Sequence, residues 1–264
     1  MNPLRTRLAA AVVGVGLVIA APAAAWAGPR RLVANTPPTS DTIPSDSNRQ
    51  GVRGVRRESI EVVRAKCLAA IDVRLPALSA AGAAVTANQH ITDDHQAALT
   101  SDIDETAARL RTLTDAIKTD ADLAALRDHC RSIFEDNRVF ALVLPRTRLV
   151  VGADTATDAG AKLHEVAAKL ADAIDKAEAA GQDVTQAKVD LDAMKAQIAS
   201  GGAAAGTVPG AVLGLTPADW NADREVLTPA RQSLRVARAD LKVARDLAVK
   251  IRNELKPAAG SPVA

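Results

Sequence analysis

Tyrosine is absent from the sequence, and phenylalanine and tryptophan occur only twice each. Trp26 lies in an N-terminal segment with a separate role, so the rest of the chain has only Phe134, Phe140 and Trp220 as aromatic residues. Sugar-binding grooves and single-stranded nucleic-acid sites use aromatic side chains as stacking platforms. The scarcity of these side chains argues against both classes, and we expect no nucleic-acid partner.

Recognisable catalytic motifs are also missing. His164-Glu165 begins like a zinc-protease helix, but the second histidine of that motif would fall at Ala168. The glycines between 201 and 214 lack the Lys-Ser or Lys-Thr that completes a phosphate-binding loop. No serine or cysteine has a plausible base nearby in the sequence. We therefore predict a protein that is not an enzyme and has no cofactor.

The best metal-binding candidate is the pair His90 and His95, with Asp93 and Asp94 between them. Imidazole and carboxylate groups are common metal ligands. However, His90 precedes a predicted helix start and His95 lies inside that helix, so the two rings need not converge. Thr92 is a good N-cap for that helix, and the two aspartates after it suit the positive end of the helix dipole. We predict no metal site, and keep metal binding through His90 and His95 as an alternative function.

The N-terminal segment has the three parts of a secretory signal peptide. Arg5 and Arg7 precede an uninterrupted apolar or glycine run over residues 8–21, and a small-x-small motif ends at Ala27. The alternative is an uncleaved membrane anchor, but the run is shorter than the roughly 20 residues that span a bilayer. We predict a signal peptide over 1–27, cleavage after Ala27, and a secreted or extracytoplasmic location. No later segment is expected to span a membrane.

Residues 28–54 are rich in Pro, Thr, Ser and Asp and have no helical period, which predicts a disordered linker. The segment up to residue 57 is basic, because only Asp41 and Asp46 oppose its arginines: Arg30, Arg31, Arg49, Arg53, Arg56 and Arg57. We favour a solvated tether over contact with anionic envelope polymers or lipid headgroups. Residues 257–264 are predicted to be a disordered tail.

The remaining chain is dominated by helical periodicity, which predicts an all-α fold: an elongated helical bundle with coiled-coil-like hairpins. We divide it into a first helical part, 55–145, and a second helical bundle, 146–256. Core-facing residues, most of them apolar, recur at spacings of three and four in both parts, for example at Leu99, Ile103, Thr106, Leu110, Leu113 and Ile117.

Four local features of this helical region depend on more than the apolar repeat. Pro76 should kink or break the first helix. The segment 139–151 fits either a helix or a β-hairpin, and we choose helix because its surroundings are helical. A helix is expected from about Asp158 to Ala180, ended by Gly181. The next helix should stop near Ser200, because residues 201–214 resemble a flexible Gly/Ala-rich loop.

The two cysteines, Cys67 and Cys130, both lie on apolar faces of predicted helices. An oxidising compartment permits a bridge between them. The alternative is two buried free thiols. We predict a disulfide between Cys67 and Cys130, because export removes the reducing environment that would oppose it.

The last predicted helix carries leucines and alanines at heptad spacing, flanked by one arginine in each of four successive heptads: Arg231, Arg238, Arg245 and Arg252. Asp158, Glu165 and Asp172 also recur at intervals of seven. We favour ion pairing between helices, as flanking charges provide in coiled coils. The alternative is a basic stripe that contacts an anionic partner.

Several helix caps and turns resemble those of an uncharacterised group of exported, Ala-rich helical proteins of actinobacteria. The resemblance covers most of residues 58–256 and rests on three segments: Ile91-Thr92-Asp93-Asp94; Leu144-Pro145 with Leu149-Val150-Val151; and Leu215-Thr216-Pro217-Ala218-Asp219-Trp220. It implies an exported helical protein and assigns no functional residues.

These observations together predict a non-enzymatic extracytoplasmic protein with a structural or protein-interaction role. Its partner would be another protein or a second copy of the chain. An alternative function is binding to an anionic cell-envelope surface through the basic linker and the arginine stripe, which predicts binding that weakens steeply with salt.

Overall fold

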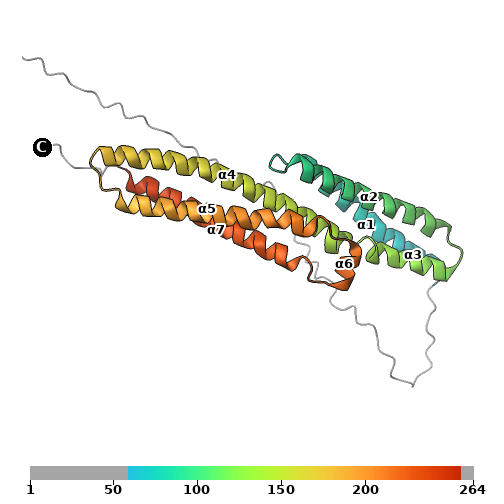
Figure 1. Cartoon of the computed structure of the whole chain (residues 1–264). Helices are drawn as coiled ribbons and strands as arrows, with labels where there is room; N and C mark the ends of the chain where they lie inside the picture. Colours follow the sequence, from blue (N-terminus) through green and yellow to red (C-terminus); the bar gives the residue numbers. More distant parts are fainter. Residues whose placement is uncertain (1–58, 257–264) are drawn as a thin grey trace, which may run out of the picture. The chain divides into compact units, whose positions relative to one another are not determined.

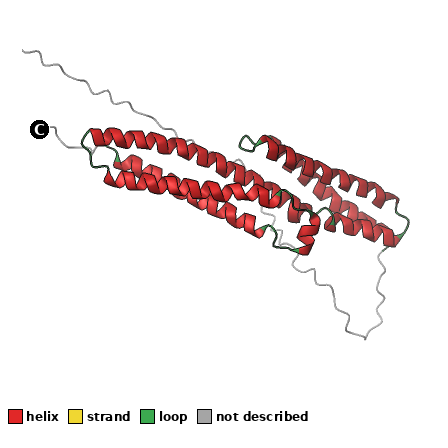
Figure 2. Cartoon of the chain, in the orientation of Figure 1, coloured by secondary structure: helices red, strands yellow, loops and turns green. Residues whose placement is uncertain are grey.

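The computed structural model describes residues 59–256, and every regular element in that range is helical (Figures 1 and 2). The all-α prediction is therefore confirmed. The elements in chain order are α1 (Ile60–Thr86), α2 (Asp93–Thr119), α3 (Leu123–Glu135), the π-helix η1 (Val139–Val143), α4 (Leu144–Ala179), α5 (Thr185–Val212), α6 (Pro217–Ala222) and α7 (Thr228–Glu254).

Several predictions lie outside the described residues. They are the signal peptide (1–27), the linker (28–54), the start of the first helical part (55–58) and the tail (257–264).

The helices α1, α2 and α3 pack against one another. Each begins at a side chain that accepts a hydrogen bond from the first turn: Ser59 from Val62, Thr92 from His95, and Asp122 from Ala125. Such caps satisfy backbone N–H groups that have no partner inside the helix. The prediction of Thr92 as a cap is confirmed. α1 continues through Pro76, so the break allowed for at that residue does not occur.

The uncertain segment 139–151 is helical, and the hairpin alternative is excluded. η1 follows Arg138, whose backbone is left-handed (φ 36°), and runs directly into α4. The expected helix start near Asp158 is wrong, since α4 begins at Leu144. Pro145 lies in the first turn of α4, where a proline removes no helical hydrogen bond and is therefore tolerated.

α4 ends at Gly181 as predicted. This glycine has φ +81°, and its N–H donates to the carbonyl of Glu178 over 2.8 Å. The N–H of Gln182 donates to the carbonyl of Ala177 over 3.0 Å, which completes a Schellman motif. A glycine is required here because side-chain-bearing residues rarely adopt this backbone conformation.

The flexible loop predicted for 201–214 is wrong, because α5 continues through these glycines to Val212. Glycine costs about 1 kcal/mol relative to alanine in a helix interior. Tertiary packing offsets this penalty, since one face of the segment is buried through Gly201, Ala205, Val208 and Val212. The other glycines of the segment, Gly202, Gly206 and Gly210, have open space around them.

α4, α5 and α7 pack side by side (Figure 1). α7 presents the predicted heptad seam, whose buried residues are Ala230, Leu234, Ala237, Leu241, Ala244, Ala248 and Ile251. Close approach depends on glycine: a Cβ added at Gly201 would lie 3.0 Å from Cγ of Leu241 and 3.1 Å from the carbonyl oxygen of Ala237. The alanine-rich seam is therefore matched by a partner helix without a side chain at the contact.

The hydrophobic core is continuous across the division predicted at 145/146. One cluster of buried side chains includes residues of α1, α2 and α3 together with the first half of α4, the end of α5 and the start of α7. The buried Arg146 of α4 also forms an ion pair with Asp102 of α2 and donates to the carbonyl of Leu215. A second cluster occupies the far ends of α4, α5 and α7.

α1 has an unusually apolar sequence for a helix with so much exposed surface. It is long and apolar enough to cross a membrane by length and composition, so the expectation that no segment after 1–27 meets this test is wrong. Its most apolar window has a mean hydropathy of 1.5, yet only 17% of that window is buried. The buried residues of α1, among them Cys67, Ile71 and Leu78, pack in the core with α2 and α3.

Candidate functional site

The four arginines predicted as a stripe are all exposed on α7. Each follows a buried seam residue directly: Arg231 follows Ala230, and Arg238 follows Ala237. A residue next to the seam lies at the edge of the helix contact, so its long side chain reaches solvent while its Cα stays close to the neighbouring helix. These four residues form the arginine row: Arg231, Arg238, Arg245 and Arg252.

The interhelical ion pairs favoured for this row are not formed within residues 59–256, so that prediction is wrong there. Arg245 pairs only with Asp246 of its own helix, at 3.6 Å, and the other three arginines have no carboxylate partner in the described range. Asp158 pairs instead with Lys162 and with His90. The hydrogen bond from Lys162 is the main reason that the pKa of Asp158 is lowered.

The row faces α4 at a point where α4 has no side chain. A Cβ added at Gly152 would lie 2.8 Å from Nη2 of Arg238 and 2.9 Å from Cδ2 of Leu234. The guanidinium of Arg238 therefore lies against the backbone of α4. Further along, a Cβ added at Gly160 would lie 3.6 Å from Cδ2 of Leu241. Both contacts advance in the same chain direction, so α4 and α7 are parallel.

The two lysines of α7 are ion-paired, in contrast to most of the row. Lys250 contacts the buried carboxylate of Asp190 on α5 at 2.6 Å, which raises the pKa of Lys250 and lowers that of Asp190. Lys242 contacts Asp246 at 2.8 Å, and this hydrogen bond lowers the pKa of Asp246. Arg235, which lies outside the row, donates to Gln232 of its own helix over 3.0 Å. The row is therefore the side of α7 that meets α4 without a carboxylate on that helix.

The two cysteines meet as predicted. Cys67 of α1 and Cys130 of α3 are both buried, their Cα atoms are 5.5 Å apart, and their sulfurs are at bonding distance. The two positions come together because each lies on the face that its helix turns towards the shared core.

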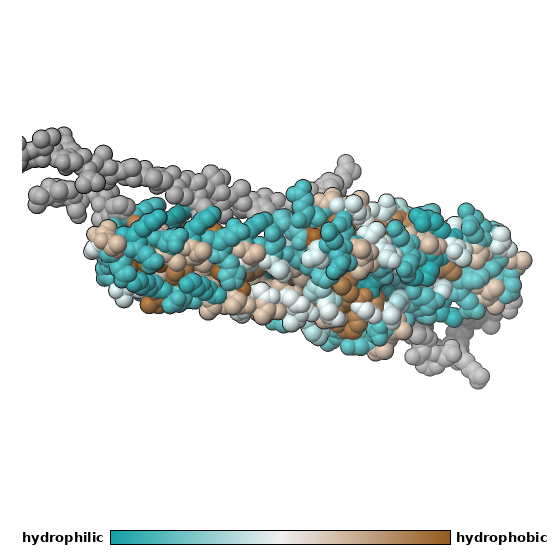
Figure 3. All heavy atoms as spheres, turned by 45° about the horizontal axis from the view of Figure 1, so that its top comes forward, coloured by the Kyte–Doolittle hydropathy of each residue, from teal (hydrophilic) through white to brown (hydrophobic). Residues whose placement is uncertain are grey.

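A second group of exposed side chains was not anticipated from the sequence. The guanidinium carbon of Arg74 lies 4.5 Å from the ring centre of Phe134 and 5.3 Å from that of Phe140. Both rings are about half exposed, at 46% and 51%, and Val73, which precedes Arg74 on α1, is 58% exposed. Apolar patches of this kind interrupt the polar surface in the space-filling view (Figure 3). This aromatic–arginine cluster is defined by Val73, Arg74, Phe134 and Phe140.

The charge of Arg74 is incompletely satisfied by the protein. Nη1 donates to the carbonyl of Ala70 over 2.6 Å, and Nε is buried without a partner in the described range. Partial burial lowers the pKa of this guanidinium. The sequence signal for the cluster was the presence of two phenylalanines six residues apart in a chain almost without aromatics. It gave no indication that α1 would place an arginine between them.

His90 and His95 form separate pairs with aspartates of α4. Nδ1 of His95 lies 2.9 and 3.0 Å from the carboxylate oxygens of Asp154, which also accepts from the N–H of Thr92. His90 meets Asp158 at 2.9 Å. In the part of the chain that the structure describes, no group of three or more histidine, cysteine or acidic side chains is arranged to hold a metal ion. These pairs attach the α1–α2 connection to α4.

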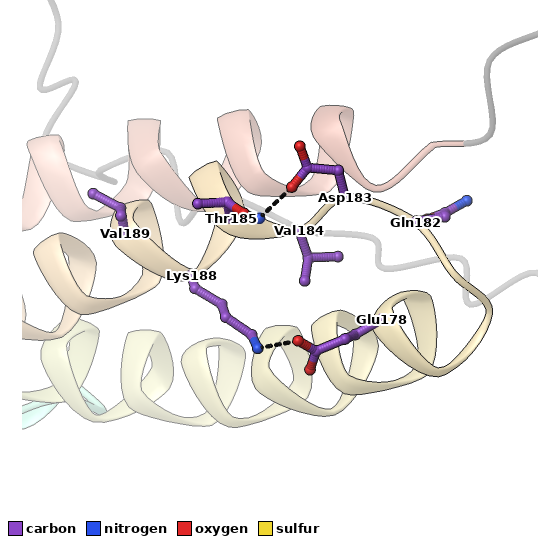
Figure 4. A pocket seen from close by; sticks show the side chains of 7 residues that line it. All are labelled: Glu178, Gln182, Asp183, Val184, Thr185, Lys188 and Val189. Carbon is purple, nitrogen blue, oxygen red and sulfur yellow. Dashed lines mark hydrogen bonds and ion pairs between the residues drawn. The ribbon is translucent and has the colours of Figure 1, made fainter.

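A surface pocket of about 490 Å³ lies at the turn between α4 and α5 (Figure 4). Its polar groups already have structural partners. Lys188 donates to Glu178 over 2.5 Å, and Asp183 accepts from the N–H of Thr185 over 3.0 Å, which lowers the pKa of Asp183. In Figure 4 these groups lie in two separate pairs, and no nucleophile and base converge there.

No family model, no curated protein and no solved structure matches the chain. The suggested relation to exported actinobacterial helical proteins therefore stays a prediction.

Proposed function

We propose that the protein is a non-enzymatic, extracytoplasmic interaction protein that binds another protein through the aromatic–arginine cluster. The observation that carries this proposal is the exposure of Phe134 and Phe140, whose rings both lie against Arg74. Two of the three aromatic residues outside the predicted signal peptide therefore lie on the surface. Each leaves apolar area in contact with water, which is unfavourable unless another molecule covers it.

The chemistry of the cluster suits the centre of a protein interface. Aromatic residues and arginine are enriched at such centres, where they supply apolar area together with directional hydrogen bonds. Exposed apolar surface extends along α1 to Val73 and Val62, so the cluster is not a single isolated side chain.

The partner should provide an acidic group flanked by apolar side chains. Arg74 has no carboxylate partner within residues 59–256, and its Nε atom lacks an acceptor there. A carboxylate on the partner would pair with the partly exposed guanidinium, and apolar groups around that carboxylate would cover the two rings.

Extracytoplasmic placement is supported by the charged, apolar and small-residue parts of segment 1–27 and by the cysteine pair. Amino-terminal sequencing of the protein recovered from the culture medium or the envelope tests this point. A chain that starts at Gly28 is expected. A full-length chain retained in the cytosol would contradict the proposal.

The binding surface is tested by placing a photoactivatable amino acid at Val73 in the exported protein and irradiating intact cells. We expect a discrete crosslinked product that disappears in F134A/F140A. The same probe at Val189, which is equally exposed on α5, serves as the matched control. An adduct of twice the chain mass would indicate a second copy in place of a different protein. Identical products from both positions, or none from Val73, would overturn the proposed surface.

A further inference from the structure

The α4–α7 contact has basic side chains along both of its outer edges. On α7 the edge is the arginine row. Gly152 faces α7, and residues three and four places away on either side continue the same side of α4. About 40° around α4 from Gly152, on the side away from the bundle core, lies a second line of residues at heptad spacing. This line consists of Arg148, Thr155, Lys162, Lys169 and Lys176. The four basic members of this set are all exposed.

The residues of α4 between these two edges are small or apolar. They continue from Gly152 at heptad spacing as Ala159, Val166 and Ala173, and each is partly buried. A carboxylate at these positions would meet the arginines directly, as in a coiled coil with complementary flanking charges. The absence of such a carboxylate leaves the row without a partner on α4, and only Arg245 has an acidic contact, with Asp246 of its own helix. The acidic residues Asp158, Glu165 and Asp172 lie beyond the lysines, on the outer side of α4.

From this arrangement we infer that the α4–α7 seam binds a linear polyanion that carries phosphate groups. The seam is defined by the arginine row together with Arg148, Lys162, Lys169 and Lys176. Because the helices are parallel, the cations of each edge repeat about every 10 Å along one line. A guanidinium binds a phosphate through two parallel hydrogen bonds, and a lysine provides a mobile point charge beside it.

The chain itself does not contain a suitable occupant. Segment 1–58 has only Asp41, Asp46 and Glu58 against eight arginines, and residues 257–264 carry no charged side chain. Charge complementarity therefore requires another molecule.

A polymer fits the seam better than a membrane surface does. Interfacial helices place large apolar or aromatic side chains beside their cations, and these enter the lipid. The exposed large apolar residues of α7 are only Val236, Val243 and Val249. Neither α4 nor α7 contains an aromatic residue, so stacking on bases is not available, and the site recognises backbone charge.

The inference is tested with the purified full chain and inorganic polyphosphate, by titration calorimetry over a series of salt concentrations. The first variant is R231Q/R238Q/R245Q/R252Q. Its matched control is R111Q/K118Q/R127Q/R131Q, which removes the same charge from exposed positions on α2 and α3. We expect the first variant to weaken binding on the order of 100-fold and to flatten the salt dependence by about three units of log–log slope. The control should lose less than a tenth as much affinity.

A second variant, K169Q/K176Q, tests whether α4 takes part. About tenfold weaker binding is expected for a seam formed by two helices. Circular dichroism and thermal unfolding verify that each variant keeps its helices. Equal losses in the first variant and its control would overturn the inference, because net charge alone would then explain binding. Unchanged affinity in K169Q/K176Q would overturn the two-helix seam.

Vesicles of phosphatidylglycerol and phosphatidylcholine provide the remaining arm. Binding to these vesicles without binding to polyphosphate would overturn the inference in favour of a lipid surface. A concentration-dependent dimer that R231Q/R238Q/R245Q/R252Q abolishes would overturn it in favour of a second copy. The aromatic–arginine cluster is unchanged in all of these variants, so failure here leaves the proposed protein interaction untouched.

Discussion

The helices before residue 143 and the helices after it pack through side chains of different size. α1, α2 and α3 interlock large buried side chains such as Ile71, Leu99 and Leu126, and a pair of cysteines joins α1 to α3. α4, α5 and α7 meet at alanines and at Gly152, Gly160 and Gly201. Close-packed interiors leave few voids, so a contact made by a glycine against a neighbouring helix has no room for an added side chain. The second group therefore depends on the absence of side chains at particular positions.

The largest effect on stability is expected from removing the disulfide that joins α1 to α3. The double variant C67A/C130A opens a loop with a sequence separation of 63 residues. In the chain-entropy model such a loop stabilises the folded state by about 4 kcal/mol. We expect the urea midpoint to fall accordingly. Hydrogen exchange should accelerate first in α1, α2 and α3, and the wild-type protein in reducing agent should behave alike. Equal stability of the variant and the oxidised wild type would contradict the prediction.

The next largest effect on stability is expected from adding a side chain at the glycine contact between α5 and α7. G201V introduces a side chain where Cγ of Leu241 and the backbone of Ala237 already lie within 3.1 Å of the added Cβ. Overpacking of this kind costs about 1–3 kcal/mol. Chemical denaturation is expected to show that loss, with exchange faster in α5 and α7.

The adjacent residue provides the control for G201V. Gly202 is a helical glycine with nothing within 4 Å of an added Cβ. G202A should therefore raise the free energy of unfolding by about 0.5–1 kcal/mol, since alanine has the higher helix propensity. A loss of stability in G202A would show that residues 201–212 are not helical in solution.

The smallest effect concerns the ion pair between Lys250 and Asp190, which joins α7 to α5. The pKa of Asp190 is lowered in the folded protein, so its stabilising contribution is present above the ordinary carboxyl pKa of about 3.9 and is lost as pH falls through the lowered value. K250M should reduce stability near neutral pH and flatten the acid limb of the stability profile. Urea unfolding from pH 2 to pH 7 measures both, and an unchanged acid limb would argue against the pair.

Much of this fold follows from the sequence because helix periodicity and caps are local signals. Thr92, Thr216 with Pro217, and Gly181 mark helix ends through hydrogen bonds within a few residues, and the structure has a helix end at each of them. The loop prediction for residues 201–214 failed because the deciding contacts are not local. The glycines there have weak helix propensity, and the burial that offsets it comes from α7, which begins only at Thr228.

The two candidate surfaces also combine features that one helix predicts with features that need the folded structure. The spacing of the arginine row and its exposure follow from the heptad of one helix. Its lack of ion pairs to α4 depends on which residues of α4 lie opposite the arginines. Those residues are determined by the parallel alignment of α4 and α7, which cannot be obtained from either helix alone. The cluster around Arg74 is similarly non-local, because its members come from α1, α3 and η1.

The bond between Cys67 and Cys130 also determines what a protease would leave behind. All of α2 and both of its connecting turns lie between the two cysteines. A single cut anywhere in that interval yields two pieces that stay attached to each other. On a gel, the nicked protein would migrate as one species until a reductant separated it into two. A chain built in this way keeps its parts together after damage that would release a helix from an unbridged bundle.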